Sequence, residues 1–396
     1  MATSILPKLT ILGGSSPFTI ELVNNLYSKN SIGAYNLVLF GRNAENLNLI
    51  CSYARYHLVK IGWSVDNTLD IDQALDGAAI IILQNRFGGI EGRIEDEKFA
   101  RYFGFPIDET LGPCGLKSAI RMTRYLGPLA KRIVALCPDA ILINLTNPLS
   151  IAVSILKMEG VNKVLGVCEL PVTTLEKIAK SLDLATDKIS WDYSGLNHRG
   201  FIYNLNHNGR NLFPDFLQKI KNNGFLGMAY KNIKHLEAIP LKYFQLFLVS
   251  SNPEGRAEHV KVIGDSIIQD LKLNGIGSPA RLNDRNMDWY KDAVMPVLEA
   301  LNSADPKISI VNRVGQDGLT IESKVRISKG TIEVIKSEQV PVQVNKWLQK
   351  FIAHEKAVLM AAVDPSPQNV GNALLLDPVI SGFDINKIQK YLLKAL

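Results

Sequence analysis

The chain has 396 residues, of which 46% are hydrophobic and 21% charged, values typical of a globular protein long enough for two domains. Its 44 basic residues exceed its 38 acidic residues, giving a net charge of +6, but the excess is spread without a basic run. No nucleic-acid partner is therefore expected. No apolar stretch approaches the roughly 18–20 residues of a membrane helix, so no membrane partner is expected either.

The start of the chain lacks the charged and apolar regions of a signal peptide. The four cysteines form no CxxC pair, which favours reduced thiols over a disulfide framework. We therefore expect a cytoplasmic protein.

The first half alternates short apolar runs with amphipathic segments of helix length. Strands are predicted over residues 8–12, 35–40, 78–84, 140–146 and 163–168. Helices are predicted over residues 19–28, 44–60, 117–136 and 150–158. Apolar strands separated by helices indicate a parallel sheet covered on both faces, hence an α/β protein with a Rossmann-type sheet.

After residue 168 the pattern changes to mixed α+β. Strands are predicted over 191–197, 201–206, 308–314 and 325–336, and helical segments over 213–304 and 342–396. We expect an NAD(P)-binding Rossmann domain over residues 1–167. A catalytic, substrate-binding and oligomerisation domain would follow over 168–396, as in lactate and malate dehydrogenases.

A small-residue turn follows the first strand and precedes the first helix. It consists of Gly13, Gly14, Ser15 and Ser16, and such a turn lets backbone amides approach a pyrophosphate at the helix N-terminus. Ser15 occupies the position of the second glycine in G-x-G-x-x-G, so an ordinary strand–helix turn is the alternative.

The second strand ends without the carboxylate that accepts a ribose 2′-hydroxyl in NAD sites. Gly41 and Arg42 stand there instead, a pattern that accommodates a 2′-phosphate. NADP is left open beside NAD, and an exposed loop arginine is the alternative.

Polar motifs follow three predicted strands. They are the segments 86–97 with 108–115, then 146–148, then 168–171. Because open α/β sheets bind ligands at the carboxyl ends of their strands, these segments are the candidate active site.

These motifs resemble glycoside hydrolase family 4, whose members are NAD- and divalent-metal-dependent glycosidases, among them 6-phospho-glucosidases, α-glucosidases and α-galactosidases. The resemblance runs through Gly13–Ser16, Arg86–Glu97, Asp108–Gly115, Thr146–Pro148, Cys168–Pro171, Gly195–His198 and Ile239–Tyr243. It implies a glycosidase that oxidises sugar C3 with NAD, removes the C2 proton, eliminates the aglycone from C1, adds water and returns the hydride. This route is an exception to two-carboxylate hydrolysis.

The resemblance assigns Cys168 and His198 as ligands of Mn²⁺ or another divalent metal, with substrate hydroxyls completing the shell. We expect the two residues to lie at neighbouring strand ends. From the residues alone, the alternatives are a buried inert thiol for Cys168 and a turn residue for His198; the set of seven motifs favours the ligand assignment for both. Asn147 would bind sugar hydroxyls, and Glu109 would support the metal ligands from behind.

Tyr243 matches the family's proposed C2 base, although a phenol needs a nearby cation to act at neutral pH; a core aromatic is the alternative. Glu169 resembles the general acid of α-type members, but its side chain is one methylene longer than their aspartate.

Arg93 and Arg285 are candidate substrate-binding residues that could hold a phosphate or carboxylate bidentately. The segment around Arg285 lacks both glycines and the serine of phospho-specific members, so a wall made by Asp288 and Trp289 for an unphosphorylated sugar is the alternative.

Two other functions remain open. A lactate/malate-type dehydrogenase would need a catalytic histidine paired with an aspartate, and a non-catalytic NAD- or sugar-binding relative would not need the metal pair. The resemblance implies a small-molecule sugar or sugar-phosphate substrate and a homodimer or homotetramer.

Overall fold

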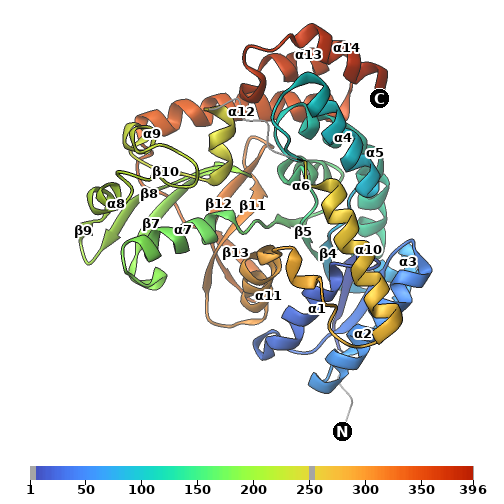
Figure 1. The fold of residues 1–396 in the computed structure, drawn as a ribbon. Coiled ribbons are helices and arrows are strands. Elements are labelled where there is room, and N and C mark those ends of the chain that lie inside the picture. Colours follow the sequence, from blue (N-terminus) through green and yellow to red (C-terminus); the bar gives the residue numbers. More distant parts are fainter. Residues whose placement is uncertain (1–5, 249–254, 396) are drawn as a thin grey trace.

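The computed structural model describes residues 6–248 and 255–395. Its centre is a 13-stranded sheet with helices packed around it (Figure 1). Eleven of the strands follow the order β10-β8-β7-β12-β11-β6-β5-β4-β1-β2-β3, while β13 pairs with β12 and β9 pairs with β8. The first six strands are parallel and have the order β3-β2-β1-β4-β5-β6, that of the doubly wound dinucleotide-binding fold. They are β1 (Lys8–Leu12), β2 (Asn36–Phe40), β3 (Ser64–Thr68), β4 (Ala78–Leu83), β5 (Ile141–Asn144) and β6 (Lys163–Gly166).

Alternate residues of these strands enter two separate cores. In β4, Ile80 and Ile82 pack with α1 (Thr19–Ser28), α2 (Ala44–Leu58), α10 (Ala257–Asn274) and α11 (Met295–Asn302). Ile81 and Leu83 face the opposite core. That core contains α3 (Ile71–Leu75), α4 (Gly89–Phe103), α5 (Gly112–Leu136) and α6 (Leu149–Met158). Apart from the polar strand β3, the parallel strands are largely apolar, as expected where both faces of a sheet are covered.

The second half of the chain extends the same sheet with antiparallel strands. A single residue pair, Asn312 with Gly166, joins β11 to β6. The added strands are β7 (Ser190–Leu196), β8 (Arg199–His207), β9 (Arg210–Asn211), β10 (Ile239–Pro240), β11 (Lys307–Val314), β12 (Thr320–Ser328) and β13 (Thr331–Val334). The helices α7 (Leu170–Ser181), α8 (Phe213–Lys219) and α9 (Tyr230–Leu236) lie beside them.

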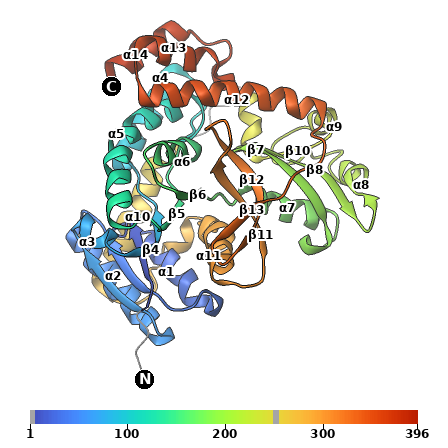
Figure 2. The same ribbon diagram turned by 180° about the vertical axis from the view of Figure 1, so that it is seen from behind.

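Three C-terminal helices close the molecule. They are α12 (Val342–Val363), α13 (Pro367–Leu375) and α14 (Ile385–Ala395). α12 runs along the top of the molecule, from α13 and α14 to α9, and passes over α6 and β7 (Figure 2). In the part of the chain described, no helix is long and apolar enough to span a membrane.

The predicted α/β class with its Rossmann-type sheet is confirmed, and the predicted strands and helices of the first half are present. The β3 strand, Ser64–Thr68, was missed because its sequence is polar. The predicted strand 325–336 is wrong: β12 begins at Thr320, and a turn at Lys329 and Gly330 separates it from β13. Residues 249–254 and 396 of the predicted helical segments lie outside the described residues. The domain division after residue 167 stays a prediction, since the sheet runs across it.

Candidate active site

The nucleotide turn lies between β1 and α1, where the sequence predicted it. The amides of Gly13 and Gly14 donate to the Phe40 carbonyl at 3.1 and 2.7 Å, which holds the turn against the end of β2. A Cβ on Gly14 would lie 2.9 Å from Leu39 Cβ, and one on Gly41 would lie 2.5 Å from the Ser15 side chain. The glycines are therefore needed for the close approach of turn and strand, and Ser15 fits because Gly41 faces it.

Arg42 follows Gly41 and is exposed. The next residue, Asn43, caps α2 by accepting from the Asn46 amide at 3.0 Å. This cap fixes the backbone beside Arg42 and leaves its side chain at the surface next to the nucleotide turn.

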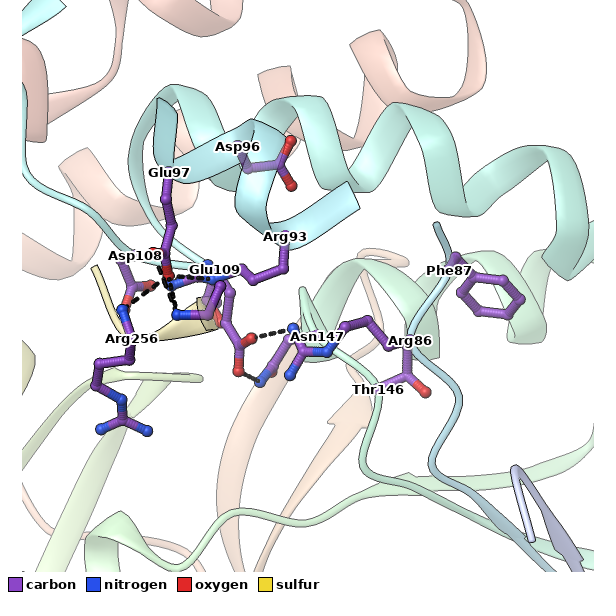
Figure 3. A network of polar contacts seen from close by, with 12 residues as sticks. Arg86, Phe87, Arg93, Asp96, Glu97, Asp108, Glu109, Thr146, Asn147 and Arg256 are labelled. Carbon is purple, nitrogen blue, oxygen red and sulfur yellow. Dashed lines mark hydrogen bonds and ion pairs between the residues drawn. The ribbon is translucent and has the colours of Figure 1, made fainter. Parts of the chain in front are cut away.

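Glu109 lies at the centre of a polar network at the carboxyl ends of β4 and β5 (Figure 3). Arg86 pairs with Glu109 Oε2 at 2.6 Å, and Asn147 Nδ2 donates to Glu109 Oε1 at 3.0 Å. Burial alone would raise the pKa of Glu109, but the guanidinium groups of Arg86 and Arg93 and the two hydrogen bonds hold it well below its usual range. Glu109 is thus a fixed carboxylate. It orients Asn147, whose Oδ1 is buried without a partner.

Arg93 lies on α4 and pairs with Glu97 one turn later, at 3.0 Å. Glu97 also accepts from the amides of Arg256 and Ala257 at 3.2 Å, which fixes the start of α10 against α4 (Figure 3). One nitrogen of Arg93, Nη1, is buried without a partner. Arg93 therefore has a structural contact and one donor left for a ligand.

Cys168 follows β6, and its thiol lies 3.7 Å from Glu169 Oε2. Burial raises the pKa of Cys168 well above its ordinary value, and the Glu169 and Glu322 carboxylates raise it further. Glu169 itself is half-buried at the start of α7 and makes no side-chain capping bond there. The Cys168 side chain is therefore a neutral thiol unless a cation displaces its proton.

His198 occupies the turn between β7 and β8 with a φ of 65°. Its ring stacks on Tyr243 at 4.4 Å between centroids, and its Nδ1 is buried without a partner. Burial lowers the pKa of His198, so the imidazole is neutral, the form that binds metals. Tyr243 comes from the 3₁₀ segment Lys242–Phe247, which the sequence placed in a longer helical stretch.

The expectation that Cys168 and His198 end neighbouring strands is wrong. Two strands, β11 and β12, lie between β6 and β7 in the sheet. Both residues still contribute to one electrostatic environment. The charge of Glu169 acts on both Cys168 and His198, and the charges of Asp108 and Glu109 act on both His198 and Tyr243. Within residues 6–248 and 255–395, no three His, Cys, Asp or Glu side chains form a metal-binding group.

Arg285 lies over the Phe18 ring at 4.1 Å and the Trp289 ring at 5.0 Å. Its Nε is buried without a partner, and among the described residues no carboxylate forms an ion pair with it. Burial, together with the like charge of Arg86, lowers the pKa of Arg285 to about 10. An anion bound to Arg285 would offset both the burial of its charge and the repulsion by Arg86.

No role was predicted from the sequence for three residues near the site. Arg86 holds Glu109, as described above. Glu322 is buried and accepts from Tyr193 and, at 2.8 Å, from Asn312; burial raises its pKa to about 7. Asn197 is fully buried, and both its amide atoms lack partners. The position of Asn197 directly before His198 was the only signal available for it.

This arrangement is that of an NAD-type fold with a polar site at its strand ends. Its fold is shared with malate dehydrogenase from Plasmodium falciparum (TM-score 0.55, 13% identity, covering 90% of this chain and 99% of that one). Models of family 4 glycosyl hydrolases match residues 8–184, and models of their C-terminal domain match residues 193–380. The chain therefore belongs to family 4 of the glycosyl hydrolases and is a glycosidase.

The chain is similar to the "Probable 6-phospho-beta-glucosidase" of Bacillus subtilis strain 168. The two are 27% identical over 418 residues, covering 96% of this chain and 94% of the other. The fold of this chain matches that of the 6-phospho-beta glucosidase from Thermotoga maritima, which was solved with manganese, NAD+ and glucose-6-phosphate. That match has a TM-score of 0.87 and 21% identity over 98% of both chains. The family resemblance expected from the motifs is thus confirmed. The likeness to dehydrogenases is a likeness of fold and not of function.

Proposed function

We propose that the chain hydrolyses 6-phospho-glycosides with the help of NAD and a divalent metal, in a reaction that removes the sugar C2 proton. The observation that carries this proposal is the stack of Tyr243 on His198, whose Nδ1 is buried and unpartnered. A buried polar atom without a partner is costly, so its retention beside a phenol supports a ligand at this point.

The nucleotide turn fits a dinucleotide. Gly13, Gly14 and Gly41 keep the turn narrow, and α1 begins directly after it, so its N-terminus faces the place where a pyrophosphate binds in this fold. Arg42 is the residue that would meet a 2′-phosphate, which keeps NADP open beside NAD.

Cys168 and His198 fit a divalent metal whose remaining ligands come from the substrate. Both side chains are neutral and buried, and a metal would displace the thiol proton of Cys168 and accept a lone pair from the His198 imidazole. Glu109 would fix Asn147 beside the bound sugar. Manganese is the metal present in the Thermotoga maritima structure. When bound, NAD would take up and return a hydride at sugar C3, and the metal would polarise the oxygen there.

Tyr243 would take the C2 proton. Burial raises the pKa of Tyr243 above its ordinary value, and the Asp108 and Glu109 carboxylates raise it further. The phenol is therefore protonated in the metal-free protein. A cation at Cys168 and His198 would oppose those carboxylates and lower the pKa, so Tyr243 would act as a base only in the loaded site.

Glu169 would protonate the leaving oxygen. It is half-buried, adjoins Cys168 and makes no capping bond to α7, which leaves its carboxyl group for a substrate atom. This role follows the resemblance to α-type members, with a longer side chain in place of aspartate.

Arg285 would bind the 6-phosphate, with Arg93 contributing its free Nη1. An arginine without a carboxylate partner that also lies close to Arg86 supports an anionic ligand. Trp289, which stacks on Arg285, would then hold the guanidinium in place and would not face the sugar.

A panel of nitrophenyl α- and β-glucosides, with and without 6-phosphate, tests the substrate class. The assay contains NAD+, Mn²⁺ and a reductant. Arg285→Met should lower kcat/KM for the phosphorylated substrate by about 30–100-fold, as for loss of a charge-assisted contact. Arg281→Met is the control, since Arg281 pairs with Asp284 at the surface. Equal turnover of phosphorylated and plain glucosides would contradict a phosphate requirement.

We also propose a cytoplasmic homodimer or homotetramer. All four cysteines are buried and unpaired, which supports a reducing compartment. Large apolar side chains are exposed near the C-terminal helices, among them Met360 (60%) and Leu375 (69%), which supports subunit contacts there.

A further inference from the structure

A buried ion pair lies directly behind the candidate metal site. Arg199, the residue after His198, pairs with Glu355 of α12 through Nη2 and Oε2. The other carboxylate oxygen of Glu355 accepts from the Ser150 hydroxyl. Arg199, Glu355 and Ser150 are 2%, 3% and 1% exposed, so these contacts are sealed from water. One carboxylate thus joins two segments that are distant in sequence.

Each of those segments carries a candidate site residue. Ser150 lies in the first turn of α6, three residues after Asn147. Arg199 begins β8 and adjoins His198. The Gly200 carbonyl also accepts from the Leu241 amide at 2.9 Å, two residues before Tyr243. α12 passes over both α6 and β7 (Figure 2), so it can fix all three segments from one side.

A second α12 residue, His354, also contacts Arg199 and is itself held by Asp377, which follows α13. His354 Nδ1 lies 3.4 Å from Arg199 Nη1, and its Nε2 lies 3.8 Å from Asp377. Burial, together with the Arg199 charge, lowers the pKa of His354 to about 3. The neutral ring therefore accepts from Arg199. Within the described residues, Glu355 is the only carboxylate paired with Arg199.

We propose that Glu355 is a positioning residue that holds His198 and Asn147 in register for metal binding and substrate binding. This inference rests on the proposed roles of those two residues. A buried ion pair contributes little net stability compared with packed apolar side chains, so stability alone does not account for placing one here. His198 has a positive φ, a conformation that its neighbours must maintain, and Arg199 supplies the fixed point beside it.

The chain offers a matched pair of substitutions to test the link to α6. Ser150→Ala removes the bond to Glu355. Ser154→Ala, one turn further along α6, removes an equally buried bond to Thr320 at 2.7 Å. Both variants should lose similar thermal stability. Only Ser150→Ala should lower kcat, by about 10-fold, because misplacing a binding group by less than 1 Å is enough for such a loss. Equal kcat in the two variants would overturn the proposal.

The link to His198 is tested by Mn²⁺ binding in the presence of NAD+ and without substrate. Arg199→Met combined with Glu355→Leu removes both charges, which leaves no unpaired ion to unfold the protein. The Kd for Mn²⁺ should rise about 10–100-fold, as for other residues that support metal ligands, with NAD+ affinity unchanged. An unchanged Mn²⁺ Kd in this variant, with His198→Ala unable to bind Mn²⁺, would overturn the inference and leave the proposed function intact. Mn²⁺ binding that survives His198→Ala would instead overturn the proposed metal site and this inference with it.

Discussion

Replacing Gly41 by alanine should damage the nucleotide site without unfolding the chain. The backbone conformation of Gly41 is one that alanine can adopt, so the only obstacle to alanine is steric contact of the added Cβ. A Cβ there would lie 2.5 Å from both Cβ and Oγ of Ser15 and 2.8 Å from its backbone nitrogen. Ordinary carbon contacts begin near 3.5 Å. The turn must therefore move by about 1 Å, and rotating the Ser15 side chain does not relieve the contact with its backbone.

Overpacking of this kind costs about 1–3 kcal/mol. If the substitution destabilises the NAD-bound protein by this amount relative to the free protein, the Kd for NAD+ rises about 5–150-fold, since 1.4 kcal/mol corresponds to a factor of ten. Calorimetric titration of NAD+ measures the change. Gly277→Ala is the control, because its Cβ would meet atoms only at 3.6 Å. Gly41→Ala combined with Ser15→Gly should recover part of the affinity, because the contact with the Ser15 side chain is then gone.

An unchanged NAD+ affinity in Gly41→Ala would refute this reasoning. It would mean either that the turn tolerates the displacement or that the dinucleotide binds elsewhere. A loss of NAD+ affinity in Gly277→Ala of the same size would refute it as well, since that substitution meets no close atom.

Three further predictions follow from the site and its surroundings. Cys168→Ser and His198→Ala should each abolish hydrolysis while NAD+ affinity stays within about twofold of wild type; a parallel loss of NAD+ affinity would assign them a structural role. NADP+ should bind about as tightly as NAD+, and Arg42→Ala should lower the affinity for NADP+ but not for NAD+. Much weaker binding of NADP+ than of NAD+ in calorimetry would make Arg42 an ordinary surface residue. Burial raises the pKa of Asp377 to about 7 from an ordinary value of 3.8, so its stabilising contribution is complete below about pH 4 and is lost as the pH rises toward 7. The unfolding temperature of wild type relative to Asp377→Asn should therefore fall by a few degrees between pH 5 and pH 8, whereas the exposed Asp187→Asn should show no such trend.

The parallel half of the fold could be predicted because its local signals agree. Its strands are apolar on both faces, and its helices begin after turns or caps such as Asn43. β3 escaped prediction because Ser64–Thr68 is a polar edge strand, whose pairing with β2 depends on the sheet and not on its own composition. The antiparallel half was harder, since β11 and β12 insert between strands that precede them in the chain.

The candidate site could be predicted as a set of residues but not as a set of contacts. The motifs gave Glu109 and Asn147, whereas the pairing of Arg86 with Glu109 requires the end of β4 to lie beside the segment before α5. The stack of His198 on Tyr243 joins residues 45 positions apart. Glu355 carried no signal at all, because it lies within a regular amphipathic helix and its partners are distant in sequence.

The central claim is that Tyr243 removes a proton from sugar C2 during hydrolysis. Turnover in D2O with NAD+ and Mn²⁺, followed by NMR of the released sugar, tests it most directly. We expect one deuterium at C2 of the product and no net NADH, since the hydride returns to the sugar that gave it. Tyr243→Phe should lose most of this turnover with little change in substrate binding. A product without deuterium at C2, or NADH formed in step with an oxidised sugar, would contradict the account.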